Sequence, residues 1–246
     1  MNLCSCQSSD LADKVAYLSA MTLKQALIDH AEATWVLAGG HSFQPVYQVL
    51  AYDYAQFLDW SKVWFLIGDE RYVLANDPES NWLAVQQHLI SKLKLKPDRL
   101  LAPRYFDNLD QMALDYEKRL NSLAKVGDSP RFDLVYLGIG EDGHSLSLFP
   151  GSAGLKASSP LVITVKDSPK PPSQRISLSL AAFKQVNQAV VVATGDNKAA
   201  ALKRLIDQDQ SIPISRIVNF IESNNGQVSL VTDNLLSASI TKQADY

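Results

Sequence analysis

Four short, largely apolar runs constrain the fold of this chain more than any other feature. They lie at residues 34–38, 63–67, 133–137 and 189–194, and each leads into glycine or charged residues. Strands that are apolar on both faces are typical of parallel sheets with helices packed against each side. The sequence therefore predicts an α/β fold built on a mostly parallel sheet that is covered on both faces.

Segments with apolar residues at helical spacing separate these runs. Helices are expected at residues 11–33, 45–54, 82–89, 109–126 and 197–206, a further strand at 161–165 and a Pro-rich turn at 169–172. Neither a linker nor an internal repeat divides the 246 residues. We therefore expect a single domain over residues 1–246, with residues 1–10 frayed.

Composition excludes several classes of function. The net charge is −3 with no basic block, which argues against a nucleic-acid partner. No apolar run approaches the roughly 20 residues of a membrane span, and the first residues lack the pattern of a signal peptide. Cys4 and Cys6 are too few for a disulfide framework or a zinc site. We expect a cytoplasmic protein without a membrane or an obligate protein partner.

Glycine and polar residues follow all four apolar runs. The four run ends carry Gly39-Gly40-His41-Ser42, Asp69-Glu70-Arg71, Glu141-Asp142-Gly143-His144 and Gly195-Asp196-Asn197-Lys198. In open α/β sheets, ligands bind outside the carboxyl ends of the strands. The repeated placement of polar residues predicts a functional site at this edge of the sheet.

The strongest candidates for chemistry are Asp142 and His144, which are two residues apart in a glycine-rich turn. A carboxylate beside an imidazole is suited to moving a proton near neutral pH. Residues 138–143 also satisfy G-x-G-x-x-G, the dinucleotide fingerprint. That pattern needs a helix after the third glycine, and Pro150 limits any helix here to about two turns. A dinucleotide site is therefore disfavoured.

The other run ends have features of an anion site, although each has a simpler interpretation. Gly39, Gly40, His41 and Ser42 could cradle a phosphate with backbone N–H groups, or form a capped turn. Lys198 could add a positive charge to that site or lie on a solvated helix surface. His30 and His88 fall in expected helices. A metal site needs three ligands at workable spacing, and only Asp142 and His144 are paired locally, so a metal site is disfavoured. A serine-hydrolase elbow, G-x-S-x-G, is absent.

Several motifs resemble those of the 6-phosphogluconolactonases. Residues 138–151, GIGEDGHSLSLFPG, resemble the family signature G-x-G-x-D-G-H-T-A-S-L-F-P-G, with Ser145 for threonine and Leu146 for alanine. Residues 39–47 are similar to G-G-S/R-T-P-x-x-x-Y, although Phe43 stands in place of proline. Residues 69–81 match D-E-R-x-V-P-x-x-x-x-x-S-N, with Leu74 in place of proline.

Two further matches lie in the second half of the chain. Arg175, in PSQRISLSLAAF, matches the arginine of P-x-x-R-I-S-L-T-L-P-A-L, and Lys198 matches the lysine of G-x-x-K. In order, these motifs extend from Gly39 to Lys198 and cover most of the chain. The resemblance implies a three-layer α/β/α fold with a Rossmann-like sheet, as in sugar-phosphate isomerases and CoA-transferases.

The resemblance also implies an activity: hydrolysis of 6-phospho-D-glucono-1,5-lactone to 6-phospho-D-gluconate in the pentose phosphate pathway, with no cofactor or metal. It makes His144 the general base, oriented by Asp142, and places Arg71 near the lactone carbonyl. The implied substrate-binding residues are Gly39, Gly40, His41, Ser42, Asp69, Arg175 and Lys198. Arg175 either binds the phosphate or braces the site.

Two alternative functions remain open at this stage. One is an amino-sugar-phosphate isomerase or deaminase, whose related loop continues with I-A-F-N-E-P; residues 145–150, SLSLFP, lack its glutamate. The other is a non-catalytic sugar-phosphate sensor on the same fold. The intact Asp142 and His144 argue against the sensor.

Overall fold

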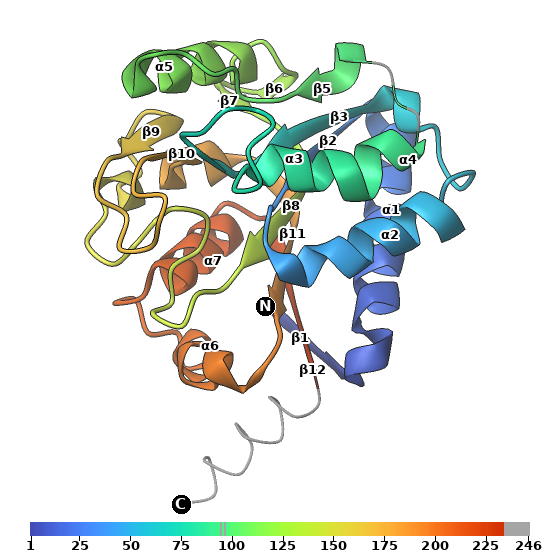
Figure 1. The fold of residues 1–246 in the computed structure, drawn as a ribbon. Coiled ribbons are helices and arrows are strands. Elements are labelled where there is room, and N and C mark those ends of the chain that lie inside the picture. The colour runs from blue at the N-terminus through green and yellow to red at the C-terminus, as the bar shows by residue number, and fades with distance from the viewer. Residues whose placement is uncertain (94, 96, 234–246) are drawn as a thin grey trace, which may run out of the picture.

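The computed structural model describes residues 1–93, 95 and 97–233, and its centre is a seven-stranded sheet (Figure 1). From one edge to the other, the strands are β1 (Asn2–Cys6), β12 (Gln227–Asp233), β11 (Val186–Ala193), β8 (Phe132–Gly138), β2 (Ala33–Leu37), β3 (Val63–Ile67) and β5 (Leu100–Leu101). All six pairings between neighbours are parallel. The carboxyl ends of these strands therefore meet along one edge.

Helices cover both faces of the sheet. They are α1 (Leu11–His30), α2 (Gln44–Asp53), α3 (Asn81–Val85), α4 (Ser91–Leu93), α5 (Leu109–Leu120), α6 (Ala199–Ile206) and α7 (Pro213–Ser223); a π-helical turn at Gln86–Ile90 joins α3 to α4. Helices α1 and α2 lie on one side and α7 on the other (Figure 1). This arrangement confirms the predicted three-layer α/β/α fold. None of the helices in the described residues is both long and apolar enough to cross a membrane.

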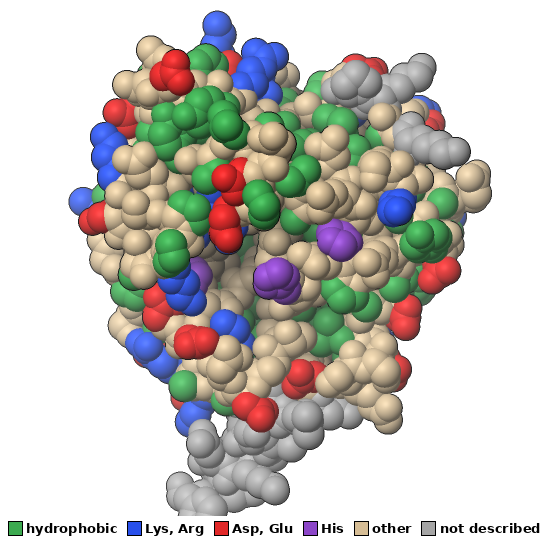
Figure 2. Space-filling model, viewed as in Figure 1, with side chains coloured by type: hydrophobic (Ala, Val, Ile, Leu, Met, Phe, Trp, Pro, Cys, Tyr) green, Lys and Arg blue, Asp and Glu red, His purple; other side chains and the backbone are tan. Residues whose placement is uncertain are grey.

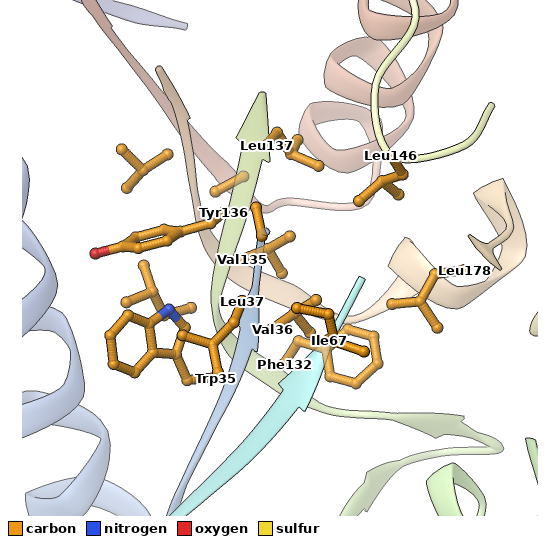
Figure 3. Close-up of a cluster of buried hydrophobic side chains, with 14 of the residues drawn as sticks. Trp35, Val36, Leu37, Ile67, Phe132, Val135, Tyr136, Leu137, Leu146 and Leu178 are labelled. Atoms are coloured by element: carbon orange, nitrogen blue, oxygen red, sulfur yellow. The ribbon is translucent and has the colours of Figure 1, made fainter. Parts of the chain in front are cut away.

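The central strands are apolar on both faces because both faces are buried. All five residues of β2 are buried. Trp35 of β2 packs edge-on against Tyr136 of β8, with ring centroids 5.1 Å apart. Figure 3 shows these two rings on one side of the sheet and Leu146 and Leu178 on the other. The strand pattern that predicted a covered parallel sheet thus has a direct structural cause.

A second, three-stranded antiparallel sheet packs beside the first. Its order is β4 (Asp69–Arg71), β10 (Arg175–Leu178) and β9 (Val162–Val165), and α5 contacts β9 and β10. The register pairs Arg71 with Arg175 and Asp69 with Ser177. Residues 69–71, which we treated as the polar end of a strand, form a short strand of their own. This strand fixes the backbone of Asp69 and Arg71 beside that of Arg175.

Two sequence-based expectations about the ends of elements were wrong. Residues 1–10 are not frayed, because Asn2–Cys6 pair in parallel with β12, a strand that local patterning did not reveal. That pairing joins residues more than 220 positions apart, so no local signal predicts it. The helix expected at 109–126 ends at Leu120, and the following residues form a hairpin of β6 (Lys125–Val126) and β7 (Ser129–Pro130).

Candidate active site

Residues from all four predicted strand ends line one cleft of about 420 Å³ at the carboxyl edge of the large sheet, and Asp142 is not among these lining residues. Residues on its wall that the sequence analysis had singled out are Gly39, Gly40, His41, Ser42, Asp69, Arg71, His144, Arg175 and Lys198. Figure 2 shows histidine, acidic and basic side chains around a hollow near the centre of this face. The structure thus brings together segments up to 159 residues apart (198 − 39).

Asp142 and His144 form a hydrogen-bonded pair on a tight turn. Oδ1 of Asp142 contacts Nδ1 of the imidazole and accepts a hydrogen bond from the backbone N–H of His144 at 3.1 Å. The turn is closed by a bond from Gly140 N–H to His144 C=O at 2.8 Å. Because Nδ1 faces the carboxylate, Nε2 is the imidazole nitrogen left for a molecule in the cleft.

The surroundings of this pair favour a neutral imidazole beside an ionised carboxylate. Burial lowers the pKa of His144, and the neighbouring Asp142 opposes this effect without cancelling it. Burial alone would raise the pKa of Asp142, but its hydrogen bonds with the ring and backbone of His144 bring that pKa below its usual value. A neutral imidazole oriented by a carboxylate can accept a proton at neutral pH.

Gly140 is required because the imidazole occupies the space of a side chain there. A Cβ at Gly140 would lie 2.0 Å from Nδ1 of His144 and 2.8 Å from Oδ1 of Asp142. Such contacts are far shorter than van der Waals distance. The glycine thus permits the close approach of the two functional side chains to the backbone.

The spacing of the 69–81 motif follows from the contacts of Glu70. Its buried carboxylate accepts hydrogen bonds from the backbone N–H groups of Arg71, Asn81 and Trp82 at 2.7–2.8 Å, and from the hydroxyl of Ser80 at 3.0 Å. Burial raises the pKa of Glu70 to about 7, and these four donors oppose that shift. Glu70 therefore ties the start of α3 to β4 instead of facing the cleft.

Asn81 links β4 to the glycine loop, which is formed by residues 39–42. Its Nδ2 donates to the backbone oxygen of Asp69 at 2.8 Å, and its side chain fills the space that a Cβ of Gly39 would occupy. Ser80 caps α3 by accepting a hydrogen bond from Leu83 N–H at 3.1 Å. Asn81 also lines the cleft, a placement that its position at the end of the 69–81 motif did not predict.

Arg71 lies on the cleft wall, and its guanidinium contacts Glu79. Its Nη1 donates to the backbone oxygen of Glu79 and lies 3.3 Å from the carboxylate of the same residue. Its Nε is buried and has no hydrogen-bond partner among the described residues. Contact between Arg71 and the lactone remains a prediction.

Arg175 mainly braces the Pro-rich loop of residues 169–172. Its Nε and Nη2 donate to the backbone oxygens of residues 170–172 at 2.9–3.2 Å. Its Nη1 lies 3.4 Å from the hydroxyl of Ser147, which donates to Asp69 at 2.6 Å. Of the two roles left open for Arg175, these contacts support bracing, while contact with a phosphate remains a prediction. Asp69 is likewise engaged with protein, through Ser147.

The proposed phosphate side of the cleft combines the glycine loop with Lys198. The hydroxyl of Ser42 lies 3.1 Å from that of Thr194, which links the loop to the end of β11. Lys198 lies at the end of a 3₁₀ turn just before α6 and is partly buried. Burial lowers the pKa of Lys198, while Glu141 raises it. His41 is exposed at the rim and contacts Gln44 at 3.3 Å.

Lys170, in the Pro-rich loop of residues 169–172, also lines the cleft, although no motif in the sequence pointed to it. Burial lowers the pKa of His144 and of Lys198, and the positive charge of Lys170 lowers both pKa values further. The one sequence signal that could have revealed Lys170 is its position between two prolines, Pro169 and Pro171. Across the described residues, no group of three or more His, Cys, Asp or Glu side chains could hold a metal ion.

The fold and the cleft together define an α/β enzyme with a histidine–carboxylate pair beside a cleft that Arg71, Lys170 and Lys198 line. Comparison with known families gives a closer placement. Residues 7–228 match the model described as glucosamine-6-phosphate isomerases/6-phosphogluconolactonase. The chain belongs to this family.

Individual relatives agree with this placement. The chain is 32% identical over 232 residues to "probable 6-phosphogluconolactonase 1" of Arabidopsis thaliana, covering 90% of this chain and 85% of the relative. It is 37% identical over 150 residues to the 6-phosphogluconolactonase of Rattus norvegicus, covering 61% and 58% of the two chains.

Solved structures extend the likeness to the whole fold. The 6-phosphogluconolactonase of Thermotoga maritima superposes with a TM-score of 0.82 at 23% identity, covering 95% of this chain and 99% of that one. A monomeric glucosamine-6-phosphate deaminase gives 0.78 at 22% identity, covering 98% and 100%. Both branches of the family therefore share this architecture, and the site residues must distinguish between them.

Proposed function

We propose that this chain hydrolyses 6-phospho-D-glucono-1,5-lactone to 6-phospho-D-gluconate, a step of the pentose phosphate pathway. The observation that carries the proposal is the Asp142–His144 pair, whose imidazole lines a cleft that also presents Lys170 and Lys198. The lactonase names of the relatives support the choice of substrate. The absence of a carboxylate from residues 145–150 disfavours the isomerase or deaminase alternative.

The proposed reaction needs one base and stabilisation of one negative charge. Nε2 of His144 takes a proton from water as the water oxygen bonds to the lactone carbonyl carbon. The resulting oxyanion lies near Arg71 and backbone amides. The bond from that carbon to the ring oxygen then breaks, and the imidazolium returns the proton to the leaving oxygen. Asp142 keeps a proton on Nδ1 and stabilises the imidazolium between the two steps.

A direct test measures acid release from freshly prepared 6-phosphogluconolactone, with spontaneous hydrolysis subtracted. Glucosamine 6-phosphate is supplied in a parallel reaction as the substrate of the other branch of the family. We expect lactone hydrolysis well above the spontaneous rate and no release of ammonia. Ammonia release without lactone hydrolysis would reverse the assignment.

Activity should be independent of metal, because the proposed steps use only protein groups. Hydrolysis of the lactone is expected to survive exhaustive treatment with EDTA, followed by removal of the chelator. Activity that disappears with chelation and returns with zinc or magnesium would contradict this mechanism.

Lys198 should determine the preference for a phosphorylated substrate. Lys198→Ala is expected to weaken binding of 6-phosphogluconate by about 1.5–3 kcal/mol, the scale of a charge-assisted hydrogen bond. The preference for phosphogluconolactone over unphosphorylated gluconolactone, as a ratio of kcat/KM values, should fall by about tenfold or more. Lys203→Ala is a matched control, because Lys203 is a partly exposed lysine of α6 that pairs with Asp207 and does not line the cleft. An unchanged preference would place the phosphate elsewhere, with Lys170 the next residue to replace.

We also propose a cytoplasmic location, since Cys4 and Cys6 are both free thiols and a reducing compartment keeps thiols in that state.

The pairing of β1 with β12 supports a single domain, because it joins the two ends of the described chain.

A further inference from the structure

The ring of Phe149 lies against the imidazole of His144. The ring centroids are 4.6 Å apart, and the two planes are inclined at 36°. The guanidinium of Arg175 lies 5.9 Å from the centroid of the same phenyl ring. Phe149 is 8% exposed. It is therefore enclosed between the proposed base and the arginine that braces the Pro-rich loop.

Local backbone structure brings Phe149 back over the catalytic turn. Ser145 and Leu148 form an isolated antiparallel bridge, with Leu148 N–H donating to Ser145 C=O at 3.0 Å. A second turn follows, in which Ser152 N–H donates to Phe149 C=O at 2.9 Å. These two bonds reverse the chain just after His144, so a residue five positions later contacts its ring.

Phe149 also borders a second cleft. This cleft, of about 790 Å³, lies between α5 and β9, and Ser147 and Phe149 are on its wall. Phe149 is not among the residues that line the first cleft. The phenyl ring thus lies between the imidazole and a space that water can enter.

We propose that Phe149 is a positioning residue for the reaction: its ring holds the imidazole plane of His144 against Asp142 and separates that imidazole from the second cleft. The role of His144 as the base rests on the function proposed above. The contact itself, and its effect on the titration of His144, do not depend on the identity of the substrate.

The proposal has a direct consequence for proton affinity. The charged groups that act on His144 are Asp142 and Asp69, which raise its pKa, and Lys170, which lowers it; burial is the largest effect and lowers it. Phe149→Ala leaves these charges in place, removes apolar cover and joins the imidazole to the second cleft. Water then stabilises the imidazolium, so the pKa of His144 should rise.

The experiment compares the wild type with Phe149→Ala and with Phe149→Tyr, which keeps the ring. Phe57→Ala is the control, because Phe57 is a partly buried ring in contact with Lys24, remote from the cleft. NMR titration resolves the four histidines, and His144→Asn identifies the signal of His144. The dependence of kcat/KM on pH is measured on the same proteins.

We expect Phe149→Ala to raise the pKa of His144 by about half a unit to one unit and to move the acid limb of the rate profile by the same amount. The rate at the plateau should fall by about tenfold or more, because the base is less well oriented. Phe149→Tyr and Phe57→Ala should resemble the wild type in both measurements.

An unchanged pKa of His144 in a folded Phe149→Ala protein would overturn the proposal. If that variant does not fold, Phe149→Leu provides the same comparison, with a smaller upward shift expected and the absence of a shift counting against the proposal. If the wild type does not hydrolyse the lactone but Phe149→Ala still shifts the NMR titration of His144, the proposed function is refuted and the positioning role stands. The two failures are therefore distinguishable.

Discussion

Replacing His144 by asparagine is expected to lower kcat for lactone hydrolysis by about 10²–10⁴, the usual contribution of a positioned base, with little change in KM. Asparagine fits the space of the imidazole but cannot accept a proton from water. Because the proposed phosphate contacts at Lys198 and residues 39–42 are untouched, affinity for 6-phosphogluconate should persist. Steady-state kinetics and a binding titration with the product measure both quantities.

The pH dependence gives an independent check of the same role. The active form of the base is the neutral imidazole, so activity is present above the pKa of His144 and is lost as the pH falls through it. Since burial lowers that pKa from its usual value, the acid limb of the wild type should lie at a lower pH than the titration of a free imidazole. His144→Asn should lack this limb. His30→Asn, a replacement of an exposed histidine at the end of α1, is the control. A His144→Asn protein with near-normal kcat would show that another group is the base.

Gly140→Ala should be nearly as damaging as loss of the base. The added methyl group would lie 2.0 Å from Nδ1 of His144, so the imidazole and Asp142 must move apart or away from the cleft. A displacement of about 1 Å at a catalytic group can cost roughly 10²-fold in rate, and we expect kcat to fall by at least about that factor. Kinetics together with the thermal midpoint distinguish misplacement from unfolding.

Gly138→Ala is the matched control for this substitution. Gly138 lies at the end of β8, two residues earlier, and a Cβ there would meet only the ring of Phe43, at an ordinary 3.9 Å. We expect Gly138→Ala to retain most of the activity. Comparable losses in both variants would indicate that the turn tolerates no added atom at all, and the specific clash with His144 would lose its support.

The motif residues show how far sequence reasoning reaches into the site. Asp142 and His144 are local to one turn, so their partnership could be predicted from spacing alone. The anchoring function of Glu70 could not be predicted from spacing. Three of its four hydrogen-bond donors come from residues 80–82, which meet Glu70 only after the chain folds back. Arg175 is similar: its sequence context left open phosphate binding or bracing, and only the positions of the carbonyl groups of residues 170–172 favour bracing.

By itself, the sequence determined the class of fold and the edge at which the site lies. Strands that are apolar on both faces require a covered parallel sheet, and parallel strands bring their carboxyl ends to one side. Tertiary structure decided the remainder, because it depends on contacts distant in sequence. The pairing of β1 with β12, the approach of Lys170 to the cleft and the placement of Phe149 against His144 are set by how elements pack. Hydrogen-bonding and packing partners far apart along the chain leave no periodic pattern in it.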